Sequence, residues 1–581
     1  YMENAGSAVD AAYEAENNGA SAALAHGTAA HGTDKLGVSG RTASSSPEIA
    51  GLRLLLNGDS AGFELCACAA ALLPEALCDR INELLYDDVG DSTAEHTAAG
   101  YSIIEDYRDE AEEYLRRYDS GGGMLAVENK RERVPKRVLS ALVSSVAAGV
   151  VPRVGAPYIA IGRADELEAL LSDLETISEG GSAMRFIIGR YGSGKSFLMQ
   201  LLRGYACERG FVTADADLSP ERRICGGAGT GIATYRELIK NLACKTSPDG
   251  GALPVMIARW LSDVQSALVA DGYAYGSEDF SEEMSRRILT TSRELQGYVG
   301  GFDFSAVIMT YYRAVQDGDD DMQSRCMKWL RGEYRTKTEA KRELPVGDII
   351  GDDNWQDMIK LLAVFARKTG YRGLVVFIDE CVNLYKIPNR ISRENNYEKL
   401  LSLFNDTMQG RSEGLGWIFG GTPQFLEDPR RGLFSYEALR SRLCDSRYDS
   451  PEYKNLLSPV IRLRRLSDNE LLALLARMTE LHAQYYGWEP PVTPENIESF
   501  LSRCLERAGA DTLLTPRELL RDYMAVLGIL MQNPDATFDG VVGSSGVALG
   551  APAEPSAEAD GEKIQKSVRS GAEITAEDID L

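Results

Sequence analysis

Histidine is scarce in this sequence, with only four residues in a chain of 581, and the ten cysteines form no CxxC pair. The two closest cysteines, Cys66 and Cys68, are not followed by a histidine pair. Protein zinc sites are built from such clusters, so a zinc centre is not expected. The cysteines are interpreted as free thiols in a reducing compartment.

Long apolar runs are also missing. No window approaches the 18 consecutive apolar residues that a membrane-spanning helix needs, so no membrane span is expected. The first residues lack the basic and then apolar pattern of a signal peptide. With the free thiols, these absences predict a cytoplasmic protein that does not contact membranes.

Acidic residues outnumber basic ones, and the net charge is −25. The excess is uneven, because residues 51–120 carry sixteen acidic and only five basic side chains. Residues 121–550 are nearly balanced, so their charge does not exclude contact with DNA. A hydrophobic fraction of 44% is typical of soluble globular proteins.

Composition and periodicity divide the chain into several parts. We interpret residues 1–50 and 534–581 as disordered tails, because they are rich in small and polar residues without helical or strand periodicity. Between them we expect an acidic helical module at 51–120, a linker at 121–134, an α/β core at 135–465 with a helical insertion at about 248–348, and a helical lid at 466–533.

Short β-branched runs alternate with helical patterns in the core, which indicates βαβ units and a parallel sheet. The expected strands cover 185–188, 210–215, 373–378, 416–420 and 460–463. In the lid, helices are expected at 468–486 and 516–531.

A GxxxxGK[ST] motif follows the first of these strands and precedes a predicted helix that begins at Phe197. Its glycines let backbone N–H groups surround a phosphate at the positive end of the helix. Lys195 is predicted to bridge the β- and γ-phosphates of ATP, and Ser196 to offer its hydroxyl to Mg²⁺. The motif consists of Gly189, Arg190, Tyr191, Gly192, Ser193, Gly194, Lys195 and Ser196.

A second signal is the continuous apolar strand 374–378, which ends in Asp379 and Glu380. Continuous apolarity indicates a central strand buried on both faces, and ligands bind at the carboxyl ends of such strands. We predict that Asp379 holds Mg²⁺ and that Glu380 polarises the attacking water. Residues 215–223, which follow the second expected strand, should open onto the same crevice.

Four further elements occur in an order that resembles the AAA+ superfamily, especially its origin-recognition-like and STAND-like branches. Ile161, Gly162 and Arg163 resemble a "GR..E" box, which implies a cradle for adenine. Thr422, after a strand, resembles sensor 1.

Two arginine motifs extend this resemblance. The segment 437–443 resembles an arginine-finger segment and implies Arg442 as the finger, with Arg440 as its competitor. The segment 514–519 resembles the sensor 2 helix and implies that Arg517 lies near the γ-phosphate. An arginine finger that a neighbouring subunit supplies implies a homo-oligomer. The alternative for each arginine is a surface ion pair.

Residues of about 130 to 533 resemble more specifically the P-loop ATPase family of bacterial BREX and TerB-linked phage-defence loci. The segments that carry this resemblance are 134–138, 186–198, 214–223, 235–238 and 436–443. It implies an ATP-binding component of an assembly with a methyltransferase, a helicase or a TerB-type protein, which contacts DNA directly or through partners. The helices within 72–115 weakly resemble the end of a TerB-type C-terminal domain, and helical packing against the ATPase is the alternative.

The end of the insertion mixes basic and aromatic residues, with Trp329 and Tyr334 among seven cationic side chains. This mixture is compatible with phosphate contact and base stacking, although a solvated helix face is the simpler interpretation. The sequence thus predicts a Mg²⁺-dependent ATPase of a DNA-defence complex. The alternatives are an ATP-dependent scaffold or switch with little hydrolysis, and a replication-type loader.

Overall fold

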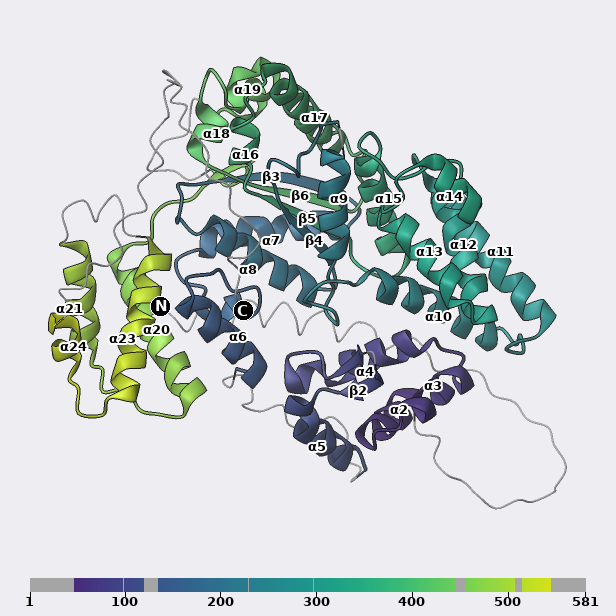
Figure 1. The fold of residues 1–581 in the computed structure, drawn as a ribbon, viewed down its shortest axis with the longest axis horizontal. Helices are drawn as coiled ribbons and strands as arrows, with labels where there is room; N and C mark the ends of the chain where they lie inside the picture. Colours follow the sequence, from purple (N-terminus) through teal and green to yellow (C-terminus); the bar gives the residue numbers. More distant parts are fainter. Residues whose placement is uncertain are drawn as a thin grey trace, which may run out of the picture. The chain divides into compact units, whose positions relative to one another are not determined.

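A five-stranded parallel sheet forms the centre of the computed structural model, which describes residues 46–97, 99–119, 134–227, 229–295, 297–445, 455–506 and 515–544 (Figure 1). The strand order is β4-β5-β6-β3-β7, so β6 lies between the strands that carry the two phosphate-site motifs. All five strands were predicted. Their bounds are Ser182–Ile188 (β3), Val212–Asp217 (β4), Leu374–Asp379 (β5), Leu415–Gly421 (β6) and Val460–Arg462 (β7).

Helices cover both faces of this sheet, which explains why β5 is apolar at consecutive positions. Val375 and Phe377 share a buried cluster with residues of α7 (Ala164–Ser178) and α8 (Lys195–Glu208). The alternate residues Val376 and Ile378 pack with α15 (Trp355–Lys368) and α17 (Arg390–Met408). Figure 1 shows α17 on one side of the sheet, and α7 and α8 on the other.

The lid contains α20 (Asp468–Tyr486), α21 (Pro494–Leu505) and α23 (Pro516–Gln532), and each of these helices begins at a capping box. The caps satisfy free N–H groups at the first turn, and the predicted starts at 468 and 516 are confirmed.

Two predicted bounds of the lid need correction. Helix α6 (Lys136–Ala147) was assigned to the core, but its buried residues Leu139 and Leu142 pack with Leu475 and Leu527 of the lid. The predicted tail at 534–581 also begins too early, because α24 (Phe538–Ser544) is a helix whose Phe538 is buried in the same cluster. Residues 545–581 lie outside the described residues.

The insertion is helical, as predicted, and its helices are α10 (Leu253–Ala270), α11 (Glu278–Leu295), α12 (Gly301–Asp317), α13 (Asp320–Leu330) and α14 (Lys337–Glu343). The base-stacking interpretation is wrong, because Trp329 and Tyr334 are each only 2% exposed. Several of the cations form ion pairs, such as Lys328 with Glu339 and Lys337 with Asp348.

The acidic module begins at Pro47 rather than at 51. The predicted tail at 1–50 therefore extends too far, because its last residues belong to α2. Residues 1–45 lie outside the described residues. It contains α2 (Pro47–Leu56), α3 (Ser60–Ala69), α4 (Pro74–Val89) and α5 (Arg108–Asp119), together with an unpredicted hairpin of β1 (Ala94–Thr97) and β2 (Gly100–Ile103). The predicted linker lies almost wholly within 120–133, outside the described residues.

Helix α4 packs against α10 of the insertion, where the Ser262 hydroxyl accepts a hydrogen bond from the Leu73 N–H at 2.9 Å. The module therefore packs against the insertion, and its resemblance to a TerB-type domain stays a prediction. No single helix in the described part of the chain has the length and apolarity to cross a bilayer, although the bent pair of α3 and α4 meets these criteria jointly.

Candidate functional site

The two predicted motifs meet at the carboxyl ends of β3 and β5. The Ser196 hydroxyl, in the first turn of α8, donates a hydrogen bond to Oδ2 of Asp379 at 2.5 Å. Gly192 and Gly194 have φ angles of 74° and 90°, which residues with a Cβ rarely adopt. These glycines let the loop turn from β3 into α8, so that the N-terminus of the helix lies at the cavity.

A cavity of about 160 Å³ lies against this loop. One end is lined by Tyr191 to Phe197 and by the side chains of Glu380 and Arg517, and the other end is apolar. Ile161 and Arg163, two of the three residues predicted from the "GR..E" box, also line it. The apolar end is formed by Val146, Val150, Val151, Pro152, Ile159, Ile161, Leu466, Leu474 and Leu520.

Residues 150–152 in this wall were not predicted. They follow α6, and no motif or periodicity in the sequence assigns them to a site. Only the packing of α6 in the lid brings them to the cavity, together with lid residues such as Leu466 and Leu520.

Lys195 faces opposing electrostatic influences. Its Nζ donates to the carbonyl of Arg190 at 3.1 Å. Burial lowers the pKa of Lys195, Arg517 lowers it further, and Asp379 and Glu380 raise it. A bound polyanion would add a negative partner that offsets the cost of burying this ammonium.

Glu380 has a φ of 55°, one of only two positive values found for non-glycine residues in the described ranges. Its N–H donates to Oδ1 of Asp379 at 2.7 Å. A positive φ is costly for a residue with a Cβ and tends to persist where function requires it. The turn leaves the Glu380 side chain in the cavity wall while Asp379 contacts Ser196.

Arg163 is only 4% exposed, and its side chain bonds to the backbone of the phosphate loop. Its guanidinium donates to the carbonyl of Ser193 at 2.8 Å and lies 3.6 Å from the Glu166 carboxylate. Burial lowers the pKa of Arg163, and Glu166 raises it. Gly162 lets the lid approach, because a Cβ there would lie 2.6 Å from the carboxyl carbon of Glu470.

Arg517 extends from lid helix α23 to the phosphate loop. Its guanidinium donates to the Tyr191 hydroxyl at 3.3 Å and lies 5.7 Å from the centre of that ring. Tyr191 is 75% exposed, so this contact holds an otherwise free aromatic side chain beside the cavity.

Thr422, Arg440 and Arg442 are not among the residues that line this cavity. The Thr422 hydroxyl accepts from the Phe425 N–H at 3.3 Å and caps α18 (Pro423–Glu427). Arg440 and Arg442 are exposed on α19 (Glu437–Leu443), where Arg442 donates to the carbonyl of Ala438. Their roles stay predictions.

A second cavity, of about 640 Å³, lies beside the same acids. The sequence predicted that residues 215–223 open onto this crevice, but it did not predict the other residues that line the cavity. Ser196, Glu380 and Arg517 line it together with Arg153 and Asp217. Burial raises the pKa of Asp217, and the nearby carboxylates, with Asp379 first among them, raise it further. Asp217 pairs with Asp379 in the register of β4 and β5, which explains their proximity.

A protein-family model described as BREX system ATP-binding protein BrxC/D matches residues 134–545. The match covers more than half of the chain, including the sheet, the insertion and the described part of the lid, and it excludes the acidic module. The comparison with curated proteins found no match.

Proposed function

The chain belongs to the family of BREX system ATP-binding proteins, and from this membership we propose that it is a Mg²⁺-dependent ATPase. The family assigns the chain as an ATP-binding component of the BREX phage-defence system. The observation that carries the step from binding to hydrolysis is the hydrogen bond between Ser196 and Asp379, which brings a phosphate loop and two acids to one point.

ATP binding uses both ends of the smaller cavity. The apolar end suits the faces of adenine, because burial of a flat apolar ring there displaces water. The phosphate end offers the Lys195 ammonium and the N–H groups at the N-terminus of α8.

The oxygens of Ser196 and Asp379 suit Mg²⁺, which prefers hard oxygen ligands and keeps several waters. When bound, the metal would neutralise charge on the phosphates. Gly420 makes room for this pair, because a Cβ there would lie 2.3 Å from Oδ1 of Asp379.

Hydrolysis requires a base for the attacking water, and Glu380 fits this role. Its carboxylate accepts a proton as the water oxygen bonds to the γ-phosphorus and the bond to the β–γ bridging oxygen breaks, releasing ADP. Lys195 and Arg517 stabilise the phosphate oxygens during this step.

The strand order and the lid arginine support an AAA+-like arrangement, in which subunits share nucleotide sites. In that scheme Arg442, or Arg440, completes a neighbour's site, and Thr422 acts as sensor 1. Partners would be further copies of the chain and other defence proteins, such as a methyltransferase, a helicase or a TerB-type protein, with DNA as the target.

Calorimetry of ATP binding to the parent protein and to Lys195→Ala tests the binding half of the proposal. We expect an affinity loss of about 10- to 100-fold, corresponding to one or two charged hydrogen bonds. Equal affinities would refute the assignment of the phosphate site.

Phosphate release by Glu380→Gln tests the catalytic half. We expect retained ATP affinity and a rate lowered by about 10²- to 10⁴-fold, the usual contribution of a general base. A parent protein that binds ATP but releases no phosphate, with and without DNA, would instead identify an ATP-dependent scaffold.

A further inference from the structure

The acidic module outside the family match, residues 47–119, contacts α10 of the insertion and also a loop of the ATPase, residues 244–249. The Thr246 hydroxyl donates to the carboxylate of Asp79, which is 3% exposed on α4. The Ser92 hydroxyl donates to the carbonyl of Thr246 at 2.8 Å. Lys245 lies over the ring of Tyr86, with 4.3 Å between its Nζ and the ring centre.

The other side of this loop contacts the helix that follows the phosphate loop. The carbonyl of Pro248 accepts a hydrogen bond from a terminal nitrogen of Arg203, on α8, at 2.7 Å. The loop begins next to β4, where Ala243 and Thr213 exchange backbone hydrogen bonds of 2.8 and 2.9 Å. Loop 244–249 is therefore bonded to the module on one side and to the nucleotide-binding core on the other.

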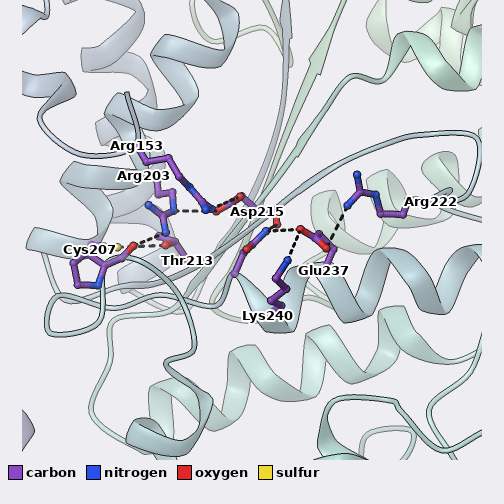
Figure 2. Close-up of polar contacts among 10 residues, drawn as sticks. Arg153, Arg203, Cys207, Thr213, Asp215, Arg222, Glu237 and Lys240 are labelled. Carbon is purple, nitrogen blue, oxygen red and sulfur yellow. Dashed lines mark hydrogen bonds and ion pairs between the residues drawn. The ribbon is translucent and has the colours of Figure 1, made fainter. Parts of the chain in front are cut away.

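Arg203 is only 4% exposed, and its second contact is the Asp215 carboxylate of β4, 3.1 Å from its Nε. Asp215 also accepts two hydrogen bonds from Arg153, at 2.9 and 3.0 Å (Figure 2). Figure 2 shows both arginines converging on this carboxylate. Breaking a contact of the buried Arg203 should cost more than breaking one of the partly exposed Arg153, so Arg203 is the stronger of the two links to Asp215.

Arg153 completes the path to the nucleotide. It directly follows residues 150–152, which form part of the apolar wall of the smaller cavity. It also lines the second cavity with Glu380 and Arg517. A displacement of Arg153 would thus move the wall against which the base is expected to bind.

We propose that residues 47–119 regulate the nucleotide site in cis, and that Arg203 is the positioning residue that links loop 244–249 to Asp215 and Arg153. The inference rests on the proposed ATP site, because the end of the path is the wall of that cavity. Its basis is a path in two parts, joined by the backbone of the loop between Thr246 and Pro248. Thr246 contacts Asp79 of the module, and Pro248 is linked through Arg203 and Asp215 to Arg153.

The test compares ATP affinities by calorimetry in the full chain. Thr246→Val removes the hydroxyl that bonds the module without touching the cavity, and Ser92→Ala removes the second contact from the module side. Arg53→Ala is the matched control, because Arg53 pairs with Asp119 within the module. We expect the first two variants to change the dissociation constant for ATP by about fivefold or more, the lower limit of typical coupling between sites, and the control to change it less than about twofold.

A double-mutant cycle with Arg203→Lys separates coupling from simple destabilisation. Lysine keeps a positive charge beside Asp215, but it lacks the planar guanidinium that contacts Asp215 and the Pro248 carbonyl at the same time. In this background the effect of Thr246→Val should disappear.

Unchanged affinity in both module variants, or an equal effect of Thr246→Val with and without Arg203→Lys, would overturn the inference. A parent chain that fails to bind ATP would instead refute the proposed function, so the two failures are distinguishable.

Discussion

The Ser196 hydroxyl and the Asp379 carboxylate, 183 residues apart in sequence, are joined by a hydrogen bond of 2.5 Å. The contact exists because β6 alone separates β3 from β5, and both motifs follow the carboxyl ends of their strands. Parallel strands end at the same edge of a sheet, so the two motifs share one crevice.

Asp379→Asn is expected to remove the dependence of ATP affinity on Mg²⁺. An amide is a weaker ligand for a hard cation than a carboxylate, and it leaves the Ser196 hydroxyl without its charged acceptor. Calorimetry with ATP in Mg²⁺ and in a chelator should show a gain from Mg²⁺ in the parent and little gain in the variant. An equal gain in both would exclude Asp379 from the metal site.

Arg517→Ala is expected to weaken ATP binding by about tenfold while leaving ADP binding nearly unchanged, because the side chain reaches the phosphate end of the cavity from the lid. Arg521→Ala is the matched control, since Arg521 is on the same helix but pairs with Asp522. Equal losses for ATP and ADP would argue that Arg517 supports the lid rather than the γ-phosphate.

Gly420→Ala should reduce ATP hydrolysis by about tenfold or more without unfolding the chain. The added Cβ would lie 2.3 Å from Oδ1 of Asp379 and 2.9 Å from the sulfur of Met199, so the carboxylate that bonds Ser196 must shift. A displaced catalytic group can cost about 100-fold in rate. Gly528→Ala, where nothing lies within 4 Å of the new Cβ, is the control. Full activity of Gly420→Ala would show that the position of Asp379 is not critical.

The lid is expected to lose stability in mild acid through His482. Burial lowers the pKa of His482 to about 4, and Trp488 donates to its Nδ1 at 3.0 Å, which requires that nitrogen to be unprotonated. Because the folded pKa lies below the unfolded value of 6.5, this stability is present above pH 6.5 and is lost as the pH falls towards 4.

As the pH is lowered from about 7 to about 4.5, the midpoint temperature of thermal unfolding should therefore fall more steeply in the parent than in His482→Gln. Parallel profiles for the two proteins would mean that His482 does not titrate on unfolding.

Local patterns in the sequence determined the five strands, two of the lid helices (α20 and α23) and the phosphate loop. These features depend on residues near one another in the chain, such as the continuous apolar run before Asp379 and the capping box at Ser467. The meeting of the two acids and the phosphate loop at one sheet edge also followed, because the carboxyl ends of parallel strands lie at the same edge.

Long-range packing decided the rest. Nothing in the sequence of α6 distinguishes packing on the lid from packing on the sheet, since either surface would bury the same apolar face. The contacts of Arg203 with Pro248 and Asp215 join segments that are distant in sequence, and a buried charge reveals its partner only once the chain has folded around it.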